Sequence, residues 1–178
     1  MTVKEYFEGP ETLRPMELVF GIVREPPAPR YGHQSVVTTL TVLLERYVRE
    51  RGLGIVCVSP IDVVLDRERA LVVQPDLIFV SNARRSIIRE RVWGAPDLVV
   101  EVLSRRTAAR DRTEKLQWYR AYGVRECWLV DPARRTIEVV SCDGGGEASS
   151  ELFSGMTPIR SAVVGGFDVG ASAVFTSY

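Results

Sequence analysis

Three apolar segments with strand composition constrain the fold of this chain most. They cover residues 54–66 (GIVCVSPIDVVLD), 70–81 (ALVVQPDLIFVS) and 96–104 (PDLVVEVLS), and they are rich in β-branched side chains. A strand that is covered on one face alternates apolar and polar residues, whereas these segments are almost continuously apolar. They therefore predict a mixed β-sheet flanked by helices on both faces, which is an α/β fold.

Two segments have the periodicity of amphipathic helices. In residues 33–51 the apolar positions recur at helical spacing and charged residues fill the opposite face. Gly52 follows this segment directly, as is common at the C-terminus of a helix. Residues 107–122 (TAARDRTEKLQWYRAY) predict a second helix, which ends before Gly123.

Shorter elements complete the predicted order. Residues 16–23 indicate a short strand or hairpin, and DRERA connects the first two strand segments as a hairpin. Residues 83–93 are either a helical turn or an arginine-rich loop, and ECWLVD and TIEVVS form an additional β-hairpin around DPARR. The chain contains 178 residues, no repeat and no long linker, so we expect a single domain over residues 1–178.

Composition limits the classes of function. The chain has 23 basic and 23 acidic residues, so a site for DNA must be a local patch and not a global positive field. No apolar run approaches the roughly 18 residues of a membrane-spanning helix, and the N-terminus lacks a signal-peptide core, so we expect a cytoplasmic protein with no membrane association. Cys57, Cys127 and Cys142 lack metal-ligand spacing, and the first two are expected to be buried apolar side chains.

Two of the strand segments contain a carboxylate that burial alone would disfavour. Asp76 lies within VVQPDLIFV and Glu101 lies within PDLVVEVLS. A buried ionised carboxylate needs a cationic partner or a metal, because losing its hydration is costly. The alternative is that each carboxylate lies at a strand end or pairs with one of the arginines.

Lys115 follows these two carboxylates in the second predicted helix. Only Lys4 and Lys115 are lysines, while the other 21 of the 23 basic residues are arginines. Two carboxylates from neighbouring strands are typical Mg²⁺ ligands, and a compact ammonium beside them would orient an attacking water and offset negative charge. Chance is the alternative explanation for a single retained lysine.

The spacing of these residues resembles a known nuclease signature. Pro75-Asp76, 24 intervening residues and then Glu101-Val102-Leu103 resemble the PD-(D/E)XK pattern of the restriction-endonuclease-like superfamily, except that Leu103 stands where the pattern has lysine. The segments QPDLIFV, GAPDLVVEVLS, DRTEKLQWY and YGVRECWLVDP are together similar to a large bacterial family, the Uma-type restriction endonucleases. This resemblance covers residues 17–140.

The resemblance implies a restriction-endonuclease-like core and a set of site residues. In that family the following helix supplies the missing lysine, and Lys115 occupies the matching position. The implied site consists of Asp76 and Glu101 as metal ligands, the main-chain carbonyl of Val102 as a third ligand, Lys115, and Glu17 and His33 close to them. The alternatives are a solvated hairpin carboxylate for Glu17 and a helix-anchoring role for His33.

Arginines cluster after the strand that carries Glu101. Arg105, Arg106, Arg110 and Arg112 are candidates for phosphate contacts with DNA, although interleaved acidic residues make a solvated surface an equal alternative.

Three neighbouring features have structural explanations. Asp97 is expected at a strand entry, because it lies only four residues before Glu101 on the same strand. Asp111 has the spacing of an i,i+4 pair with Lys115. The aromatic residues Trp118, Tyr119 and Tyr122 are expected in the core.

The sequence thus predicts an endonuclease that hydrolyses DNA phosphodiester bonds with Mg²⁺ or Mn²⁺. The first alternative is a non-catalytic module of the same fold that binds nucleic acid or a protein. A more remote one is a metal-dependent hydrolase acting on another phosphoester. Since nucleases of this fold that cut both strands often pair, a homodimer is a further expectation.

Overall fold

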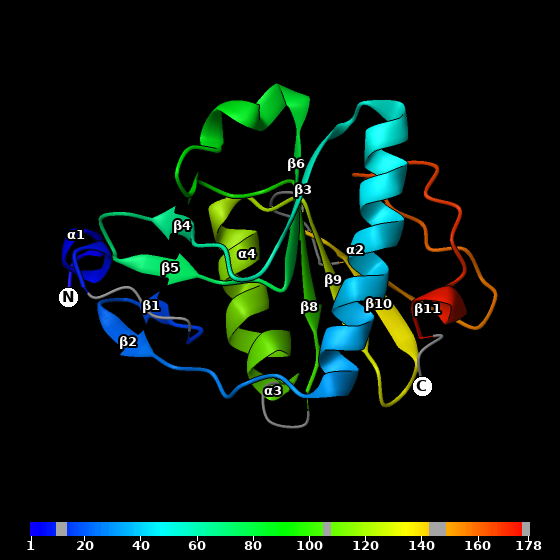
Figure 1. Cartoon of the computed structure of the whole chain (residues 1–178), viewed down its shortest axis with the longest axis horizontal. Helices are drawn as coiled ribbons and strands as arrows, with labels where there is room; N and C mark the ends of the chain where they lie inside the picture. Colours follow the sequence, from blue (N-terminus) through cyan, green and yellow to red (C-terminus); the bar gives the residue numbers. More distant parts are fainter. Residues whose placement is uncertain (10–13, 105–107, 143–148, 176–178) are drawn as a thin grey trace.

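The structure, a computed structural model, describes residues 1–9, 14–104, 108–142 and 149–175, and its strands form two mixed sheets (Figure 1). In the six-stranded sheet the order is β11-β10-β9-β8-β6-β3, and only β8 and β9 run parallel. Its strands are β3 (Gly54–Val58), β6 (Leu77–Ser81), β8 (Leu98–Val102), β9 (Glu126–Asp131), β10 (Thr136–Ser141) and β11 (Ser150–Ser154).

The five-stranded sheet has the order β2-β1-β5-β4-β7, and only β4 and β7 are parallel. Its strands are β1 (Glu17–Val19), β2 (Ile22–Arg24), β4 (Val63–Asp66), β5 (Leu71–Val73) and β7 (Val92–Trp93). The helices are α1 (Val3–Phe7), α2 (Tyr31–Arg51), α3 (Ala108–Arg110) and α4 (Leu116–Tyr122), with a π-helical turn η2 (Asp111–Lys115) and 3₁₀ turns η1 (Asn82–Ile87) and η3 (Ala171–Phe175).

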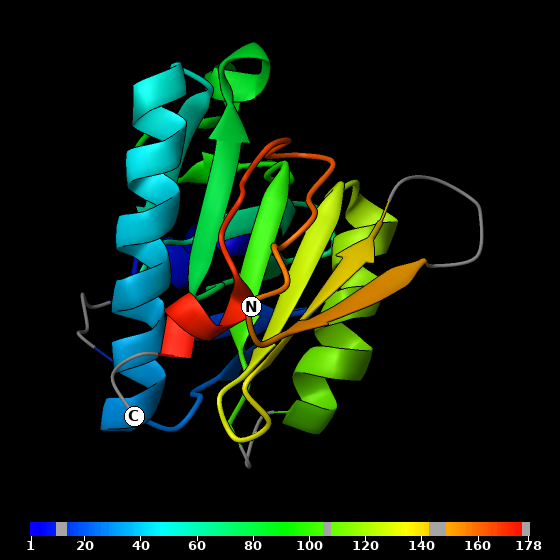
Figure 2. The same ribbon diagram turned by 90° about the vertical axis from the view of Figure 1, so that its right-hand side faces the viewer.

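The six-stranded sheet is covered on both faces, which confirms the predicted α/β class. Helix α2 and turn η3 pack on one face, while α4 and the five-stranded sheet pack on the other. Figure 1 shows the sheet between α2 and α4, and Figure 2 shows its strands side by side, with α2 at the left of the view. Burial on both faces is the reason that the strand segments are almost continuously apolar.

Two predicted strands are each divided between the sheets. Residues 54–66 form β3 and β4, and residues 70–81 form β5 and β6. Pro60 and Pro75 lie at the two divisions, and a proline cannot donate a hydrogen bond to a neighbouring strand. The chain therefore leaves one sheet near each proline and continues in the other.

Both predicted helices are present. Helix α2 ends as expected at Gly52, which has a φ of 60°. The second helix is described from Ala108, because residue 107 lies outside the described residues, and it contains a π-helical turn that the sequence pattern did not predict. It ends before Gly123, with a φ of 89°. Strand β11 was also not predicted, since four of its five residues are exposed and lack an apolar pattern.

Side chains along β8 point alternately to the two faces of the sheet, and this alternation directs Glu101 towards α4. Val100 belongs to the core on the α2 side, whereas Val99 belongs to the core on the α4 side, and Glu101 shares the face of Val99. Leu77 on β6 pairs with Val100, so the antiparallel register places Asp76 opposite Glu101. The two carboxylates therefore lie on the same face of the sheet.

Two further expectations can be compared with the structure. None of the helices in the described ranges combines the length and the hydropathy that crossing a membrane requires. Cys127 is buried, as expected, whereas Cys57, which was also expected to be buried, is only partly so. Cys142 is buried too, and its thiol donates to the carbonyl oxygen of Val140.

We predict that Gly54→Ala destabilises the fold far more than Gly52→Ala. A Cβ atom at Gly54 would lie 2.1 Å from the carbonyl oxygen of Val80, whereas at Gly52 nothing lies within 4 Å and only its φ of 60° is unfavourable. In urea denaturation we expect a loss of about 3 kcal/mol or more for Gly54→Ala and about 1 kcal/mol for Gly52→Ala. Equal losses would contradict the close packing of β3 against β6.

Candidate functional site

Lys115 joins two carboxylates that come from distant parts of the chain. Its Nζ atom lies 3.0 Å from Oε1 of Glu17 on β1 and 2.9 Å from Oε1 of Glu101 on β8. Lys115 lies in η2, and all three residues are buried. The structure thus brings together three residues that the sequence analysis selected.

Asp76 and His33 lie next to this group. Oδ2 of Asp76 accepts a hydrogen bond of 2.7 Å from the backbone N–H of Val102, the residue after Glu101. Oδ1 of Asp76 lies 3.0 Å from Nε2 of His33, in the first turn of α2. All five predicted side chains therefore belong to one cluster, with the backbone of Val102 beside them.

The cluster contains three further residues that were not assigned to it. The hydroxyl group of Tyr119 donates a hydrogen bond to Oε1 of Glu101. Nη2 of Arg110 donates to Oε2 of Glu17 at 2.6 Å. Asp111 is buried, and its negative charge acts on both Glu101 and Lys115.

A signal for two of these residues was present in the sequence. Asp111, Lys115 and Tyr119 are spaced four residues apart, so they share one side of a helix. Asp111 was predicted to form an i,i+4 pair with Lys115; it is buried, and its negative charge acts on Lys115 and raises the pKa of that ammonium. Tyr119 is in the core as predicted, but its hydroxyl group also contacts a site carboxylate.

The predicted DNA-contacting arginines are engaged within the chain wherever they are described. Arg110 pairs with Glu17, and Arg112 forms an ion pair with Glu138 on β10. Arg105 and Arg106 lie outside the described residues. A role in phosphate binding stays a prediction for all four.

Asp97 belongs to a different part of the sheet, as the sequence analysis expected. It directly precedes β8 and accepts a hydrogen bond of 2.8 Å from the backbone N–H of Ser81. Its other carboxylate oxygen lies 3.4 Å from Nη1 of Arg125. The second Pro-Asp pair of the sequence therefore supports a strand entry.

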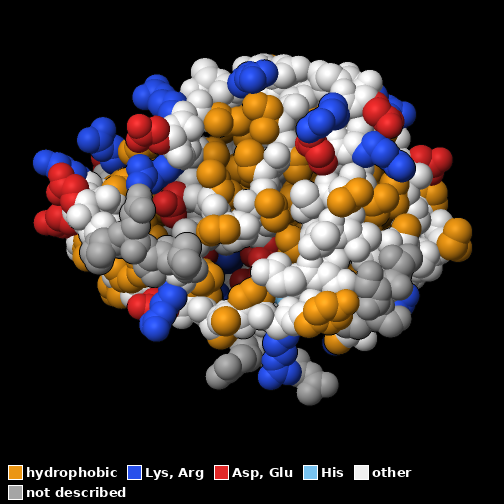
Figure 3. All heavy atoms as spheres, in the orientation of Figure 1, with side chains coloured by type: hydrophobic (Ala, Val, Ile, Leu, Met, Phe, Trp, Pro, Cys, Tyr) orange, Lys and Arg blue, Asp and Glu red, His pale blue; other side chains and the backbone are white. Residues whose placement is uncertain are grey.

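The side chains of the cluster differ in how deeply they are buried. The side chains of Glu17 and Glu101 are 1% and 4% exposed, whereas those of His33 and Asp76 are 16% and 19% exposed. Figure 3 shows acidic and basic side chains at the bottom of a hollow near the centre of one face of the molecule. Asp76 and His33 thus form the solvent-accessible side of the cluster, and Lys115 lies beneath them.

The two carboxylates that share Lys115 have opposite pKa shifts. Burial raises the pKa of Glu101 to about 8, and the charges of Asp111 and Asp76 add to this effect while Lys115 opposes it. Burial also acts on Glu17, but the charges of Lys115 and Arg110 outweigh it and lower the pKa of Glu17. Among the described residues Glu17 has a second cation and Glu101 does not, so burial favours the neutral form of Glu101 and not that of Glu17.

Lys115 and His33 both favour their cationic forms. Burial alone would lower the pKa of Lys115, but the charges of Glu101, Glu17 and Asp111 raise it. Lys115 therefore remains an ammonium that donates hydrogen bonds. Burial also opposes the cationic form of His33, yet the hydrogen bond and charge of Asp76 raise the pKa of His33.

The donor atoms of the cluster suit a hard divalent cation. Lys115 and Tyr119 both contact Oε1 of Glu101, which leaves Oε2 as its oxygen for a metal. Asp76 and the Val102 carbonyl add further oxygen donors. Within the described ranges no three or more His, Cys, Asp and Glu side chains form a metal-binding group. One or two carboxylates are nevertheless the usual protein contribution to a Mg²⁺ site, where water and phosphate oxygens complete the coordination.

We predict that the metal-free protein loses stability as the pH rises from about 5 to 8. Glu101 keeps its proton in the folded state up to about pH 8 but loses it near 4.5 in the unfolded chain. The folded state then binds more protons in this window, so the free energy of unfolding falls with rising pH, by at most about 1.4 kcal/mol per pH unit for one proton. Glu101→Gln cannot titrate and should reduce this slope.

The measurement is urea denaturation in the presence of a chelator at several pH values. The raised pKa of His33 gives a slope of the same sign, so some pH dependence should remain in Glu101→Gln. The depressed pKa of Glu17 matters only in more acidic solution, where its stabilisation is lost. Parallel curves for wild type and Glu101→Gln would show that Glu101 is already ionised in the folded state.

Comparisons with known proteins agree with the nuclease resemblance. The profile of the Uma2 family, described as "Putative restriction endonuclease", matches residues 3–171. A crystal structure of a "putative nuclease belonging to DUF820" from Anabaena variabilis has a TM-score of 0.82 and 17% identity, and the match covers 99% of this chain and 98% of that chain. At this identity the likeness concerns the fold. No curated protein matches the chain. Since the family profile covers most of the sequence, this chain belongs to the Uma2 family of putative restriction endonucleases.

Proposed function

We propose that this protein is a divalent-metal-dependent endonuclease that hydrolyses phosphodiester bonds in DNA. The observation that carries the proposal is the placement of the Lys115 ammonium 2.9 Å from Glu101, beside a second carboxylate, Asp76, that lies opposite Glu101 in the sheet register. Family membership supports a nuclease, and the cluster supports the metal-dependent chemistry.

Asp76, Glu101 and the Val102 carbonyl are the groups that would hold Mg²⁺ or Mn²⁺. When bound there, the cation supplies Lewis-acid polarisation of the scissile phosphate and lowers the pKa of a water. Asp76 is already oriented by the Val102 N–H group and by His33, so this ligand needs little reorganisation. Glu101 must release its proton to act as a ligand, which favours binding at higher pH.

Lys115 is assigned to orient the attacking water and to offset negative charge on the phosphate. An ammonium has three donors, and two of them are directed at Glu17 and Glu101. We assign the third donor to the reacting groups. Glu17, which Arg110 holds from its other oxygen, is a positioning residue that fixes the direction of the ammonium.

The first alternative is a non-catalytic module that binds nucleic acid or a protein. Within this alternative, the ion pairs of Arg110 and Arg112 with acidic residues favour a protein partner over nucleic acid, because both guanidinium groups are partly neutralised where phosphate contacts were expected. An intact pair of carboxylates with a buried lysine favours the enzyme.

The test is cleavage of labelled single- and double-stranded DNA in Mg²⁺ or Mn²⁺. Asp76→Asn and Glu101→Gln keep the size of each side chain and remove a carboxylate that could bind the metal, so we expect rates lower by about 10²–10³-fold, the usual loss for one preorganised electrostatic contact. Asp97→Asn is the matched control, because it changes the carboxylate of the second Pro-Asp pair, whose partners are Ser81, Arg84 and Arg125. Folded Asp97→Asn should cleave at the wild-type rate.

Lys115 requires a different substitution. Removing its charge would leave two buried carboxylates without their shared cation and endanger the fold. Lys115→Arg keeps the charge but not the compact geometry, so it should reduce the rate more than it reduces metal affinity. Wild-type protein that binds DNA and never cleaves it would support the binding module, and full activity of Asp76→Asn and Glu101→Gln would refute the assigned site.

A further inference from the structure

Strand β3 forms an edge of the six-stranded sheet that is half-buried up to Val58, and its own sequence lacks the features that normally protect such edges. It is the last strand of the six-stranded sheet, and its sequence, GIVCV, contains no charge and no proline. The opposite edge, β11, carries Glu151, and the edge strands of the other sheet have only two or three residues. Unprotected apolar edges accept further strands, because their outer backbone groups have no partner in the sheet.

The hydrogen bonds around β3 show which of its residues face outwards. The backbone N–H of Ser59 donates to Asp76, and the carbonyl of Leu53 accepts from Asn82, so both flanking residues bond towards β6. In an antiparallel pair every second residue exchanges these bonds. The odd-numbered residues of β3 therefore bond to β6, and the even-numbered ones present their N–H and carbonyl groups to the outer edge.

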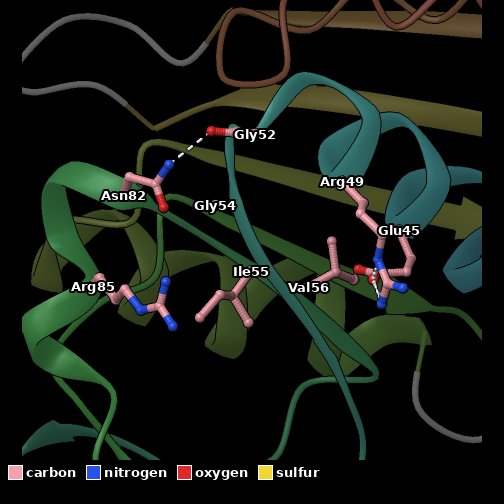
Figure 4. A pocket seen from close by; sticks show the side chains of 8 residues that line it. All are labelled: Glu45, Arg49, Gly52, Gly54, Ile55, Val56, Asn82 and Arg85. Atoms are coloured by element: carbon pink, nitrogen blue, oxygen red, sulfur yellow. Dashed lines mark hydrogen bonds and ion pairs between the residues drawn. The ribbon is translucent and has the colours of Figure 1, made fainter.

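The two ends of this edge have complementary shapes. At one end Gly54 has no side chain and borders a hollow of about 510 Å³ between α2 and η1. Figure 4 shows Arg85 and Asn82 on one side of β3 there, and Glu45 and Arg49 on the other. At the other end Val58 is 44% exposed. Val58 shares the strand face of Gly54, since they are four residues apart.

We propose that a second copy of this chain pairs with β3 in antiparallel orientation, with Val56 of both copies on a two-fold axis. A two-fold interface places the same surface on both partners. In this register Gly54 of one copy lies opposite Val58 of the other, so the exposed valine enters the hollow beside the glycine. The two six-stranded sheets then become one continuous sheet.

The charges along the edge support a copy of the same chain as the occupant. Arg49 and Arg85 line the Gly54 end, and Glu45 neutralises only Arg49, at 2.8 Å. The Val58 end leads to Asp62 and Asp76, which are about one-fifth exposed. Arg91 lies 3.4 Å from Asp62 and His33 lies 3.0 Å from Asp76, so both carboxylates are partly neutralised within their own copy. Antiparallel pairing brings the basic end of one copy to the acidic end of the other.

The face that carries the β3 edge has the distribution of apolar and charged side chains that a protein interface needs. Figure 3 shows hydrophobic side chains gathered over the upper middle of the face, above the hollow with its charged groups, and most of the other charged groups towards its periphery. An apolar centre with a charged rim is the usual composition of a protein interface. The pairing does not depend on the proposed nuclease activity, although it turns Arg85 of one copy towards the Asp76 end of the other.

Sedimentation of the full chain at micromolar concentration tests the proposal. We expect about twice the chain mass of 19.9 kDa for wild type and a monomer for Val56→Pro, which removes an outward N–H group and no bond to β6. Leu152→Pro is the matched control, because the N–H group of Leu152 also points outwards, at the β11 edge of the same sheet. It should stay dimeric. A monomeric wild type, or a dimeric Val56→Pro, would overturn the proposal.

If Val56→Pro fails to fold, cross-linking tests whether β3 pairs with β3 of a second copy. On the two-fold axis the two Cα atoms of residue 56 should be about 5.5 Å apart, which allows a disulfide. Val56→Cys should give a covalent dimer under mild oxidation, whereas wild type, with its native cysteines, and Leu152→Cys should give none. A folded Val56→Cys protein that does not cross-link would refute this register.

A charge reversal tests the pairing of basic and acidic ends. Arg85→Glu should raise the dimer dissociation constant roughly threefold to tenfold, since it places like charges together at the rim. Arg89→Glu makes the same change at an exposed arginine that does not line the hollow. An equal effect of both substitutions would indicate a general charge effect and would argue against the proposed register.

Discussion

The shared ion pair of Lys115 with Glu17 and Glu101 is the interaction on which the cluster depends. One ammonium serves two buried carboxylates, so the fold cannot stabilise both of them as anions to the same degree. Arg110 supplies Glu17 with a second cation, whereas within the described part of the chain Glu101 has only the hydroxyl group of Tyr119 as a further hydrogen-bond donor besides Lys115. This difference explains why the pKa of one carboxyl falls and that of the other rises.

The fold assembles this cluster from chain segments that are far apart in sequence. Strand alternation places Asp76 and Glu101 on the face of the sheet that α4 covers, and β1 in the second sheet carries Glu17 to the same place. The π-helical turn that contains Lys115 packs against them, and its ammonium contacts Glu17 and Glu101. Such turns are frequent at functional sites, because they change which side chains of a helix share a face.

The site and the proposed dimer edge are connected through β3. The strand runs from the hollow beside Gly54 to the turn that holds the backbone of Asp76 through Ser59. A partner strand along β3 would therefore reach the accessible side of the cluster. This arrangement relates the assembly of the protein to the environment of its candidate site.

The amino-acid sequence determined the elements of this protein and the types of residue in its site. Apolar continuity predicted strands that are covered on both faces, and helical periodicity predicted α2 and the helix that carries Lys115. Buried carboxylates are costly, so Asp76 and Glu101 stood out because each lies within an apolar strand segment. These signals are local, and a sequence shows them directly.

Only the tertiary structure decided how the elements are combined. The division of two strand segments between the sheets depends on where the chain can continue its hydrogen bonds beyond Pro60 and Pro75, which no local pattern specifies. The burial of Asp111 and the pairing of Arg110 with Glu17 likewise depend on the packing of the second sheet against the helix. Charge pairing and burial are properties of side chains that the fold brings together from distant segments. The fold, and not the sequence pattern, therefore raised the pKa of Glu101 and placed β3 at the edge of its sheet.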